Sequence, residues 1–348
     1  MFDSKTIRVA TKELHQFFGS PIGYLFLLAF LGFTFFVFFW GEAFFARNIL
    51  DVRPMFEWMP VLLIFLSSAL TMRMWSEERR SGTQEFILTL PATTWELVVG
   101  KFLACWTLLG IALLLTLPLP LTLAFVDTSV MGLDWGPVLA GYVAAILLGA
   151  SYISIGLFVS ARSDNQIVAL ILASLACGAF YLVGSPFLLD LVDNNGANML
   201  RMIGSGSRFE SITRGMLDFR DLYFYVSIAA GFLALNVYAL DRQGWSTDAP
   251  PVRHRRSQIL LGLVVTNVLV ANVWVHGVGN ALRWDVTRGD QYSMSKATLQ
   301  YLQRLREPLL IRGYFSAKTH PLLAPLVPQM QDLLTEYGVA GGDRVRVE

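Results

Sequence analysis

The ionisable side chains that could do chemistry are concentrated in residues 76–101, which read SEERRSGTQEFILTLPATTWELVVGK. Its pair Gly100-Lys101 is followed by Phe102, and no G-x-x-x-x-G-K-S/T occurs anywhere, so the chain has no phosphate-cradling loop of its own. The four histidines are scattered, and no residues have the spacing of metal ligands. We therefore predict no catalytic residue, no metal site and no cofactor in this chain.

The composition of the whole chain is that of a membrane protein. Of its 348 residues, 54% are hydrophobic and only 15% are charged, whereas a soluble domain has about 25% charged residues. The net charge is +1, so no basic field invites nucleic acid as a partner. Cys105 and Cys177 both lie inside apolar runs, which favours two buried thiols over a disulfide or a metal site.

Seven apolar runs are long enough to cross a bilayer, which takes about 20 residues. The first run lacks a short apolar core followed by a small-residue cleavage site, so we expect it to be retained in the mature protein. We predict spans at 22–41, 56–75, 98–125, 136–160, 166–190, 222–240 and 258–280.

The distribution of lysine and arginine predicts the orientation, because cytoplasmic segments are enriched in both. One side of the predicted membrane collects Lys5, Arg8, Lys12, Arg73, Arg79, Arg80, Lys101, Arg162, Arg242, Arg253, Arg255 and Arg256. The other side collects about half as many, Arg47, Arg53, Arg201, Arg208, Arg214 and Arg220. We therefore expect the N-terminus and residues 76–101 to be cytoplasmic, and the C-terminal end to be extracytoplasmic.

The composition changes at about residue 282, where polar sequence with soluble periodicities begins. Ser295 precedes a helical run, EPLLIRGYFS has the pattern of a strand, and PLVPQMQDLLTEYG that of a helix ended by Gly338. The final DRVRVE is a further strand. This β-α-β-α-β order spans about 65 residues, which provides little core, so we expect the sequence to end inside a longer extracytoplasmic domain.

Residues 76–101 contain two helix-start signals. Ser81 with Gln84 and Thr93 with Glu96 each fit a capping box. Between them, Phe86, Ile87 and Leu90 fall on one side of a short helix that Pro91 ends. The stretch is thus predicted to be an amphipathic helix near the membrane surface, hinged to the third span. It is either an interfacial anchor or a docking element whose charged tip meets a soluble partner.

Two segments carry a resemblance to a known family. WSEERRSGTQEFILTLPATTWELVVGKFLA resembles the cytoplasmic signature of ABC-2 type permeases, and SRFESITRGMLDFRDLYFYVSI, residues 207–228, resembles the segment before their sixth span. Together with six spans, the resemblance covers residues 5–242. The segment RWDVTRGDQYSMSKATLQYLQRLREPLLIRGYFS resembles the opening of the auxiliary domain of gliding-motility-type systems, which normally sits on a separate subunit behind its own transmembrane helix. The chain therefore looks like a permease fused to the start of its partner.

The resemblance implies an all-α polytopic membrane protein of the bacterial inner membrane. A six-helix ABC-2 permease bundle would occupy residues 1–242, a cytoplasmic linker 243–257, and a seventh transmembrane helix 258–281. That helix would lead into a partial extracytoplasmic α/β domain at 282–348.

The resemblance also implies the partners. A cytoplasmic ABC ATPase, which would hold the ATP and Mg, is expected to dock at 76–96, and a second permease copy to complete a dimer. The docking residues would be Glu77, Glu78, Arg79, Arg80, Gly82, Thr83 and Glu85. Arg79 and Arg80 are equally well explained as positive-inside anchors, and Gly82 as a turn residue or a helix stop. On the outer side, contacts to substrate or to an auxiliary protein are expected from Asp218, Arg220 and Asp221, for which a structural cap is an equal alternative.

The predicted spans carry no charged residue near mid-membrane, since Arg73, Lys101, Arg162 and Asp164 all fall near span ends. Ion-coupled carriers usually keep ionisable groups there, which argues against a proton- or sodium-driven carrier. The expected function is the transmembrane subunit of an ABC transporter that exports its substrate. The alternative is a non-transporting subunit of an ATPase-driven envelope assembly, such as gliding or secretion machinery, that acts mechanically on its extracytoplasmic domain. The substrate is not readable from the sequence.

Overall fold

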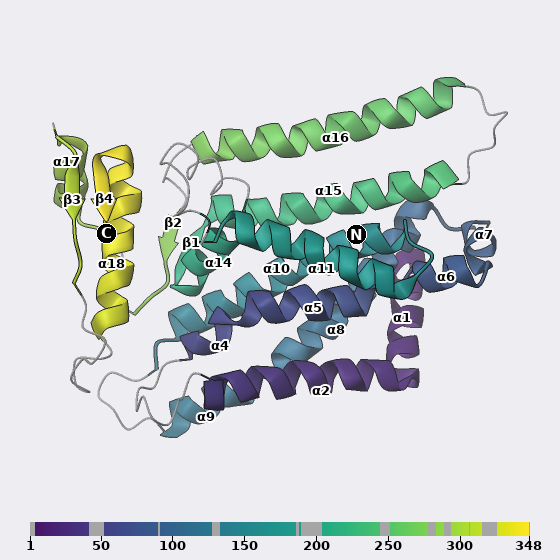
Figure 1. Cartoon of the computed structure of the whole chain (residues 1–348), viewed down its shortest axis with the longest axis horizontal. Helices are drawn as coiled ribbons and strands as arrows, with labels where there is room; N and C mark the ends of the chain where they lie inside the picture. The colour runs from purple at the N-terminus through teal and green to yellow at the C-terminus, as the bar shows by residue number, and fades with distance from the viewer. Residues whose placement is uncertain are drawn as a thin grey trace.

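A computed structural model describes residues 4–41, 52–89, 91–126, 133–185, 188, 204–243, 251–277, 283–288, 294–305, 307–314 and 326–347. Leu90 and the segments 127–132 and 189–203, on which some sequence predictions fall, lie outside these residues. The described part is a long bundle of roughly parallel helices with a small α/β unit beyond one end (Figure 1).

The first half of the bundle begins with α1 (Ser4–Gly19), which crosses one end of the molecule, and continues into α2 (Pro21–Phe36) with a π-helical turn at Val37–Gly41 (Figure 1). The elements that follow are α4 (Arg53–Glu57), α5 (Met59–Thr71), α6 (Ser76–Arg80), α7 (Thr83–Leu88), α8 (Thr94–Leu114) and α9 (Pro118–Val126). The third predicted span is therefore broken between α8 and α9, where Pro118 cannot continue the helix that precedes it.

The second half contains α10 (Trp135–Ser160), α11 (Gln166–Val183), α14 (Gly206–Thr213), the strand β1 (Met216–Asp218), α15 (Phe219–Gln243) and α16 (Pro251–Gly277). The last helix begins inside the segment predicted as a linker, which is helical from Pro251 onward. The division of the chain into four parts stays a prediction.

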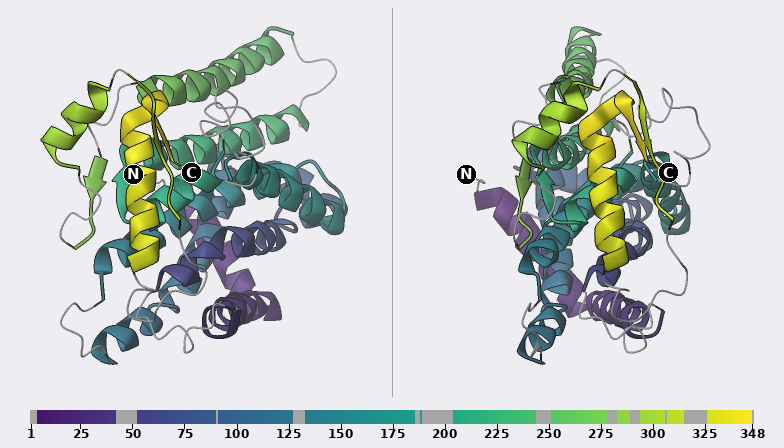
Figure 2. Two further views of the ribbon diagram at one scale, coloured as in Figure 1. Left: turned by 60° about the vertical axis from the view of Figure 1, so that its left-hand side comes forward. Right: turned by 90° about the vertical axis from the view of Figure 1, so that its left-hand side faces the viewer.

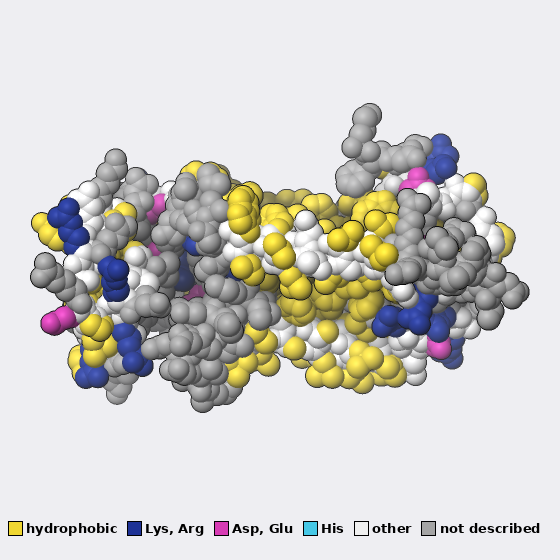
Figure 3. Space-filling model, turned by 90° about the horizontal axis from the view of Figure 1, so that it is seen from above, with side chains coloured by type: hydrophobic (Ala, Val, Ile, Leu, Met, Phe, Trp, Pro, Cys, Tyr) yellow, Lys and Arg dark blue, Asp and Glu magenta, His cyan; other side chains and the backbone are white. Residues whose placement is uncertain are grey.

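Seven of the described helices or helix pairs are long and apolar enough to cross a membrane, and each overlaps one predicted span. Seen from above, apolar side chains form a broad middle region of the bundle and charged ones gather toward the two ends (Figure 3). The chain is thus an all-α polytopic membrane protein. Below, the end at which α6 and α7 lie is called the α6 end, and the opposite end, at which β1 lies, is called the β1 end.

The core of the bundle surrounds α10, which packs against α5, α8, α11 and α15. Small side chains on α10, including Ala144, Ala145 and Ser154, are fully buried and allow close approach between helices, as is common in membrane bundles. By contrast, none of the residues in the apolar stretch of α16, Gln258–Val275, is buried. Its Asn272 donates from Nδ2 to the Ser227 Oγ of α15 at 2.7 Å, an interhelical hydrogen bond of the kind that joins helices in membrane bundles.

The C-terminal unit contains β2 (Arg283–Asp285), α17 (Lys296–Gln303), β3 (Leu309–Ile311), α18 (Leu326–Gly341), a 3-10 turn (Gly342–Arg344) and β4 (Val345–Val347). Ser295 caps α17 as predicted, its Oγ accepting from the Thr298 amide. β3 and β4 pair in parallel beside α18 (Figure 2). The prediction that Gly338 ends the helix was wrong: α18 runs on to Gly341, and the glycine with a left-handed φ of 55° is Gly342.

The strand at the start of this unit does not join its sheet. β2 pairs instead with β1 of the bundle, antiparallel, with Leu217 opposite Trp284. The expected β-α-β-α-β order therefore holds for the chain sequence, but among the described residues its first strand belongs to the bundle. Because β1 leads directly into α15, this pairing fastens the C-terminal unit to a transmembrane helix.

Candidate functional site

The charged stretch at 76–96 forms two short helices, α6 and α7, at the α6 end, where the sequence predicted a single short amphipathic helix (Figure 1). α6 continues from α5 after an irregular turn at 72–75. The Ser160 Oγ at the end of α10 accepts from the amides of Trp75 and Ser76 and donates to the Met72 carbonyl at 3.0 Å. One buried hydroxyl thus satisfies the backbone groups that the break in the helix would leave unpaired.

The predicted capping box at Ser81 and Gln84 was wrong. Ser81 ends α6: its amide donates to the Glu77 carbonyl at 2.9 Å and its Oγ to the Glu78 carbonyl at 3.2 Å. Gly82 follows with φ 72°, a left-handed conformation that glycine adopts without strain. An added Cβ at Gly82 would meet nothing within 4 Å, so the backbone angle alone requires this residue. It turns the chain from α6 into α7.

Most of the predicted docking residues form one exposed surface. We call Glu77, Arg80, Gly82, Thr83, Glu85 and Phe86 the α6–α7 face, and all six are exposed. Of the side chains expected on the apolar side of the helix, Phe86 is 69% exposed and Ile87 packs on the core, whereas Gln84, expected elsewhere, is buried. α7 has only six residues, so its burial is decided by contact with the bundle and not by a helical stripe.

Glu78 points the other way, into a buried cluster of charges. The Lys101 ammonium of α8 lies 2.6 Å from the Glu78 Oε1 and 3.3 Å from the Glu13 Oε1 of α1, and it donates to the Met74 carbonyl at 2.9 Å. It also lies 4.7 Å from the centre of the Trp75 ring. Glu78 was predicted to contact the partner, but in the structure its side chain points into the bundle and bonds to Lys101.

Arg79 bonds to the turn between α10 and α11, and its two predicted roles, docking a partner and anchoring the cytoplasmic side, stay predictions. Its side chain pairs with Asp164 in the turn between α10 and α11, and its Nη1 donates to the Ala161 carbonyl at 3.3 Å. It therefore fastens α6 to that turn. Arg80, in contrast, is exposed on the α6–α7 face.

The predicted capping box at Thr93 and Glu96 is confirmed, and it starts α8. One residue later, the Thr94 Oγ1 donates to the Asp241 Oδ1 at 2.5 Å. Asp241 lies near the end of α15, so the start of α8 is bonded to α15. Lys5 of α1 donates to the Pro91 carbonyl at 2.8 Å and so contacts the connection between α7 and α8.

At the β1 end, Asp218, Arg220 and Asp221 are paired within the chain. Arg220 donates from Nε to both oxygens of Asp218, at 3.0 and 2.8 Å, and Arg208 donates from Nη1 to the Asp221 Oδ1 at 2.7 Å. The carboxylates are almost entirely buried. A structural cap accounts for these pairs, and their contact with a substrate stays a prediction.

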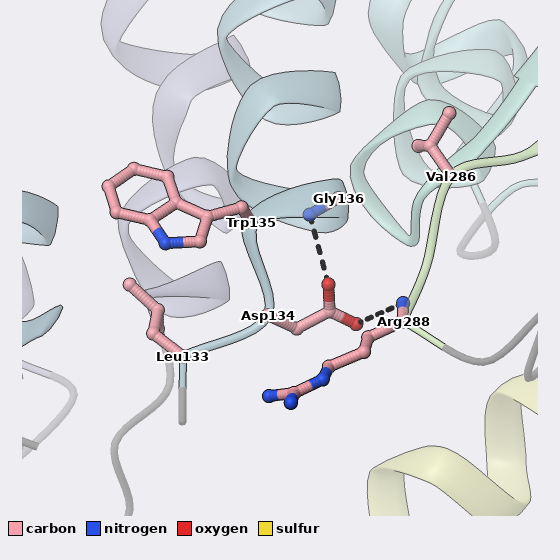
Figure 4. Close-up of a pocket in the computed structure, with 6 residues that line it drawn as sticks. All are labelled: Leu133, Asp134, Trp135, Gly136, Val286 and Arg288. Atoms are coloured by element: carbon pink, nitrogen blue, oxygen red, sulfur yellow. Dashed lines mark hydrogen bonds between the residues drawn. The ribbon is translucent and has the colours of Figure 1, made fainter. Parts of the chain in front are cut away.

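The segment that follows β2 rests on the start of α10. The Asp134 carboxylate accepts from the Gly136 amide at 2.9 Å and from the Arg288 amide at 3.0 Å (Figure 4). The Val286 amide donates to the Gly215 carbonyl at 3.0 Å. A shallow hollow of about 310 Å³ lies beside these residues. A Cβ at Gly136 would come within 2.0 Å of the Val286 carbonyl oxygen, so only glycine permits this contact.

The contact between Glu13 and Lys101 was not predicted from the sequence. The signal was present, since Glu13 is the one acidic residue of α1 and Lys101 stands in an apolar helix. Their pairing depends on how α1 crosses α8, which no periodicity specifies. Among the residues that the structure describes, no group of three or more His, Cys, Asp or Glu side chains could hold a metal ion.

Comparison with protein families gives two matches. The model of the ABC-2 family transporter protein matches residues 45–275. A model described as a domain of unknown function (DUF7088) matches residues 288–348. No match is found among the curated proteins.

Proposed function

Because the chain belongs to the ABC-2 family of transporter proteins, we propose that it is the permease subunit of an ATP-driven exporter and that its ATPase docks on the α6–α7 face. Members of this family are membrane subunits that generally work with a cytoplasmic ATPase and often dimerise. The ATPase would hold the ATP and Mg. In this arrangement the chain performs no chemistry itself.

The observation that carries the proposal is the contrast between the two sides of α6 and α7. Their outward side exposes Glu77, Arg80, Glu85 and Phe86, which is a charged rim around an aromatic side chain. Aromatic residues and arginine are enriched at the centres of protein interfaces. Their inward side is fastened directly to α8 and to the turn after α10, and through Lys101 of α8 to α1. A surface held this firmly can receive a partner and pass on its movement.

ATP can bias the permease only if the ATPase binds two permease states with different free energies. That difference has to pass through the contacts of the α6–α7 face. Thr94 and Asp241 extend the connection from α8 to α15, which runs the length of the bundle (Figure 1). The proposal places the α6 end in the cytoplasm of a bacterial cell, the β1 end outside its inner membrane, and two copies of the chain in one transporter.

The test is to purify the tagged chain gently from its native membrane and to identify bound proteins by mass spectrometry. The informative variant is Glu77→Arg with Glu85→Arg, because both side chains are exposed on the α6–α7 face. Glu78→Arg is unsuitable, since it would place a second cation against Lys101. The matched control is Glu210→Arg, the same substitution at an exposed position of the β1 end.

We expect an ATPase with a phosphate-cradling loop to accompany the normal chain and the control, and to be lost from the double variant. Retention of that ATPase by the double variant would remove the α6–α7 face from the proposal. If no ATPase accompanies the normal chain, the transporter proposal itself is wrong.

The β1–β2 pairing favours a second candidate function, in which the ATPase drives the C-terminal unit mechanically. The unit begins with a strand bonded to the strand that opens α15, and Thr94 bonds the other end of α15 to α8. Movement at the α6 end would thereby reach the C-terminal unit through one helix. Such a subunit would serve an envelope assembly, of the gliding or secretion type, without passing a substrate.

Spin labels at Leu139→Cys and Tyr301→Cys, two exposed positions on α10 and α17, test the mechanical candidate. A unit that transmits force gives a narrow distance distribution between the labels. A broad distribution in the complete complex would leave the C-terminal unit too loosely held for this role.

A further inference from the structure

The dipeptide Gly100-Lys101 is a sequence feature that docking of an ATPase leaves unexplained. It lies two turns into α8, and both residues are buried. Neither reaches the α6–α7 face. Both instead contact α1, the helix that crosses the α6 end (Figure 1).

Gly100 permits a close crossing of α1 over α8. An added Cβ at this position would lie 2.6 Å from the Val9 Cγ1 and 3.1 Å from the Thr6 carbonyl oxygen. The first contact is with a side chain, but the second is with backbone, which cannot rotate away. A larger residue would therefore push α1 off α8.

Lys101 then joins three elements at one point. Its side chain is 2% exposed, and its ammonium has three protons to donate. It has three acceptors, which come from α1, from α6 and from the turn that precedes α6. A buried cation without partners costs several kcal/mol, so α1 and α6 cannot both move away from Lys101 without a large penalty.

We propose that Gly100 and Lys101 are positioning residues that make α1, α6 and the start of α8 one moving body. This inference rests on the proposed docking of an ATPase on the α6–α7 face. The ATPase pushes on α6, and Lys101 carries the displacement to α8 directly and to α1 through Glu13. The N-terminal helix is then part of the mechanism that couples ATP to the bundle, and not only a membrane anchor.

An ionic joint of this kind has an advantage over an apolar one. Hydrophobic side chains of similar volume often stabilise a protein as well or better, but they permit sliding, whereas an ammonium with its acceptors specifies one arrangement.

The test uses the complete chain with its ATPase in lipid, with Cys105 and Cys177 replaced by alanine. Spin labels at Thr11→Cys and Thr89→Cys report the distance between α1 and the connection after α7; both positions are exposed and lie outside the α6–α7 face. Distances are measured without nucleotide and with a non-hydrolysable ATP analogue. Bound ATPase is quantified in each sample.

The normal chain is expected to give one narrow distance that is the same in both states. In Glu13→Gln and in Lys101→Met, the distance should shift by about 2 Å or more with nucleotide, as for a packed helix that slides. Gly100→Ala should act in the same direction. The matched controls are Arg8→Met, an exposed cation elsewhere on α1, and Gly110→Ala on α8, whose Cβ would come within 4 Å only of the tip of Ile146, at 3.9 Å.

Two results would overturn the inference: a nucleotide-dependent distance in the normal chain, or an unchanged distance in all three informative variants. Lys101→Met leaves two buried carboxylates and can fail to fold. Glu13→Gln and Gly100→Ala then decide the matter, because they keep the Lys101–Glu78 pair. Absence of bound ATPase from the normal chain would instead count against the proposed function.

Discussion

The two ends of the bundle differ in the bonds that attach their peripheral segments. At the α6 end, side chains attach α6: the buried Lys101 ammonium lies between Glu13 and Glu78, and Arg79 pairs with the exposed Asp164. At the β1 end, buried ion pairs such as Arg208–Asp221 also occur within the bundle, but backbone attaches the C-terminal unit: β1 pairs with β2, and the Val286 amide donates to the Gly215 carbonyl.

This difference has a mechanical meaning. Because the Lys101 ion pairs join helices to one another, α1, α6 and the start of α8 can move as one body. A strand pair keeps one register, because a slip of one residue would move every side chain to the opposite face. We infer that the α6 end is the part that changes during function and that the β1 end is the part that holds.

The largest effect on stability is expected when the cation at the α6 end is removed. Lys101→Met leaves the Glu13 and Glu78 carboxylates buried and unpaired, and the loss of one member of a buried ion pair costs about 3–5 kcal/mol. The free energy of unfolding, measured by denaturant in detergent, should fall by that amount. The control is Lys5→Met, whose exposed bond to the Pro91 carbonyl is worth about 1 kcal/mol. Equal losses in the two variants would show that the Lys101 cluster is not special.

The matching change at the β1 end acts on backbone. Gly136→Val would place side-chain atoms within the space of the Val286 carbonyl and should lift β2 from β1. Amide exchange of residues 216–218 is then expected to accelerate about tenfold or more, since each lost hydrogen bond contributes about 1 kcal/mol. Gly178→Ala serves as the control, because its Cβ would meet nothing within 4 Å. Unchanged amide exchange in Gly136→Val would mean that the pairing of β2 with β1 does not depend on the contact between Gly136 and Val286.

A smaller effect is expected where the two ends are connected through α15. Thr94→Val removes the hydrogen bond to Asp241 and should lower the free energy of unfolding by about 1.5–3 kcal/mol, the range for bonds to a charged group. Thr89→Val is the matched control, since the Thr89 Oγ1 bonds only to the Phe86 carbonyl of its own turn. A loss of stability no larger than that of the control would mean that the Thr94–Asp241 hydrogen bond does not connect α15 to the α6 end.

The smallest effect is expected at the capping box that starts α8. Thr93→Ala removes one half of the capping box and should cost about 1 kcal/mol, measured in the same unfolding experiment. Thr93→Ser keeps the hydroxyl and should retain nearly all of the stability. A Ser variant as unstable as the Ala variant would assign the cost to lost methyl contacts instead.

The sequence predicted the membrane bundle well because spans depend on composition and length. All seven predicted spans overlap helices of the bundle. The capping box at Thr93 was also predictable, since both of its bonds are local. The box at Ser81 was not, because Gly82 adopts a left-handed angle that ends α6 first.

The candidate site was predictable in its location but not in the direction of its side chains. The motif WSEERRSGTQEF identified the stretch, yet only packing decides that Glu77 is exposed while Glu78 faces Lys101. The pairing of β2 with β1 joins residues about 70 positions apart, and three-residue strands carry too little pattern to reveal it.

Photocrosslinking at position 86 tests the central claim most directly. Phe86 of the α6–α7 face and Phe125 of α9 are both exposed phenylalanines, at 69% and 87%, and each can be replaced by benzoylphenylalanine in the native membrane. We predict that position 86 forms an adduct with a protein that carries a phosphate-cradling loop and that position 125 does not. Adducts with lipid alone at position 86 would contradict the account, because the α6–α7 face would then be an interfacial anchor.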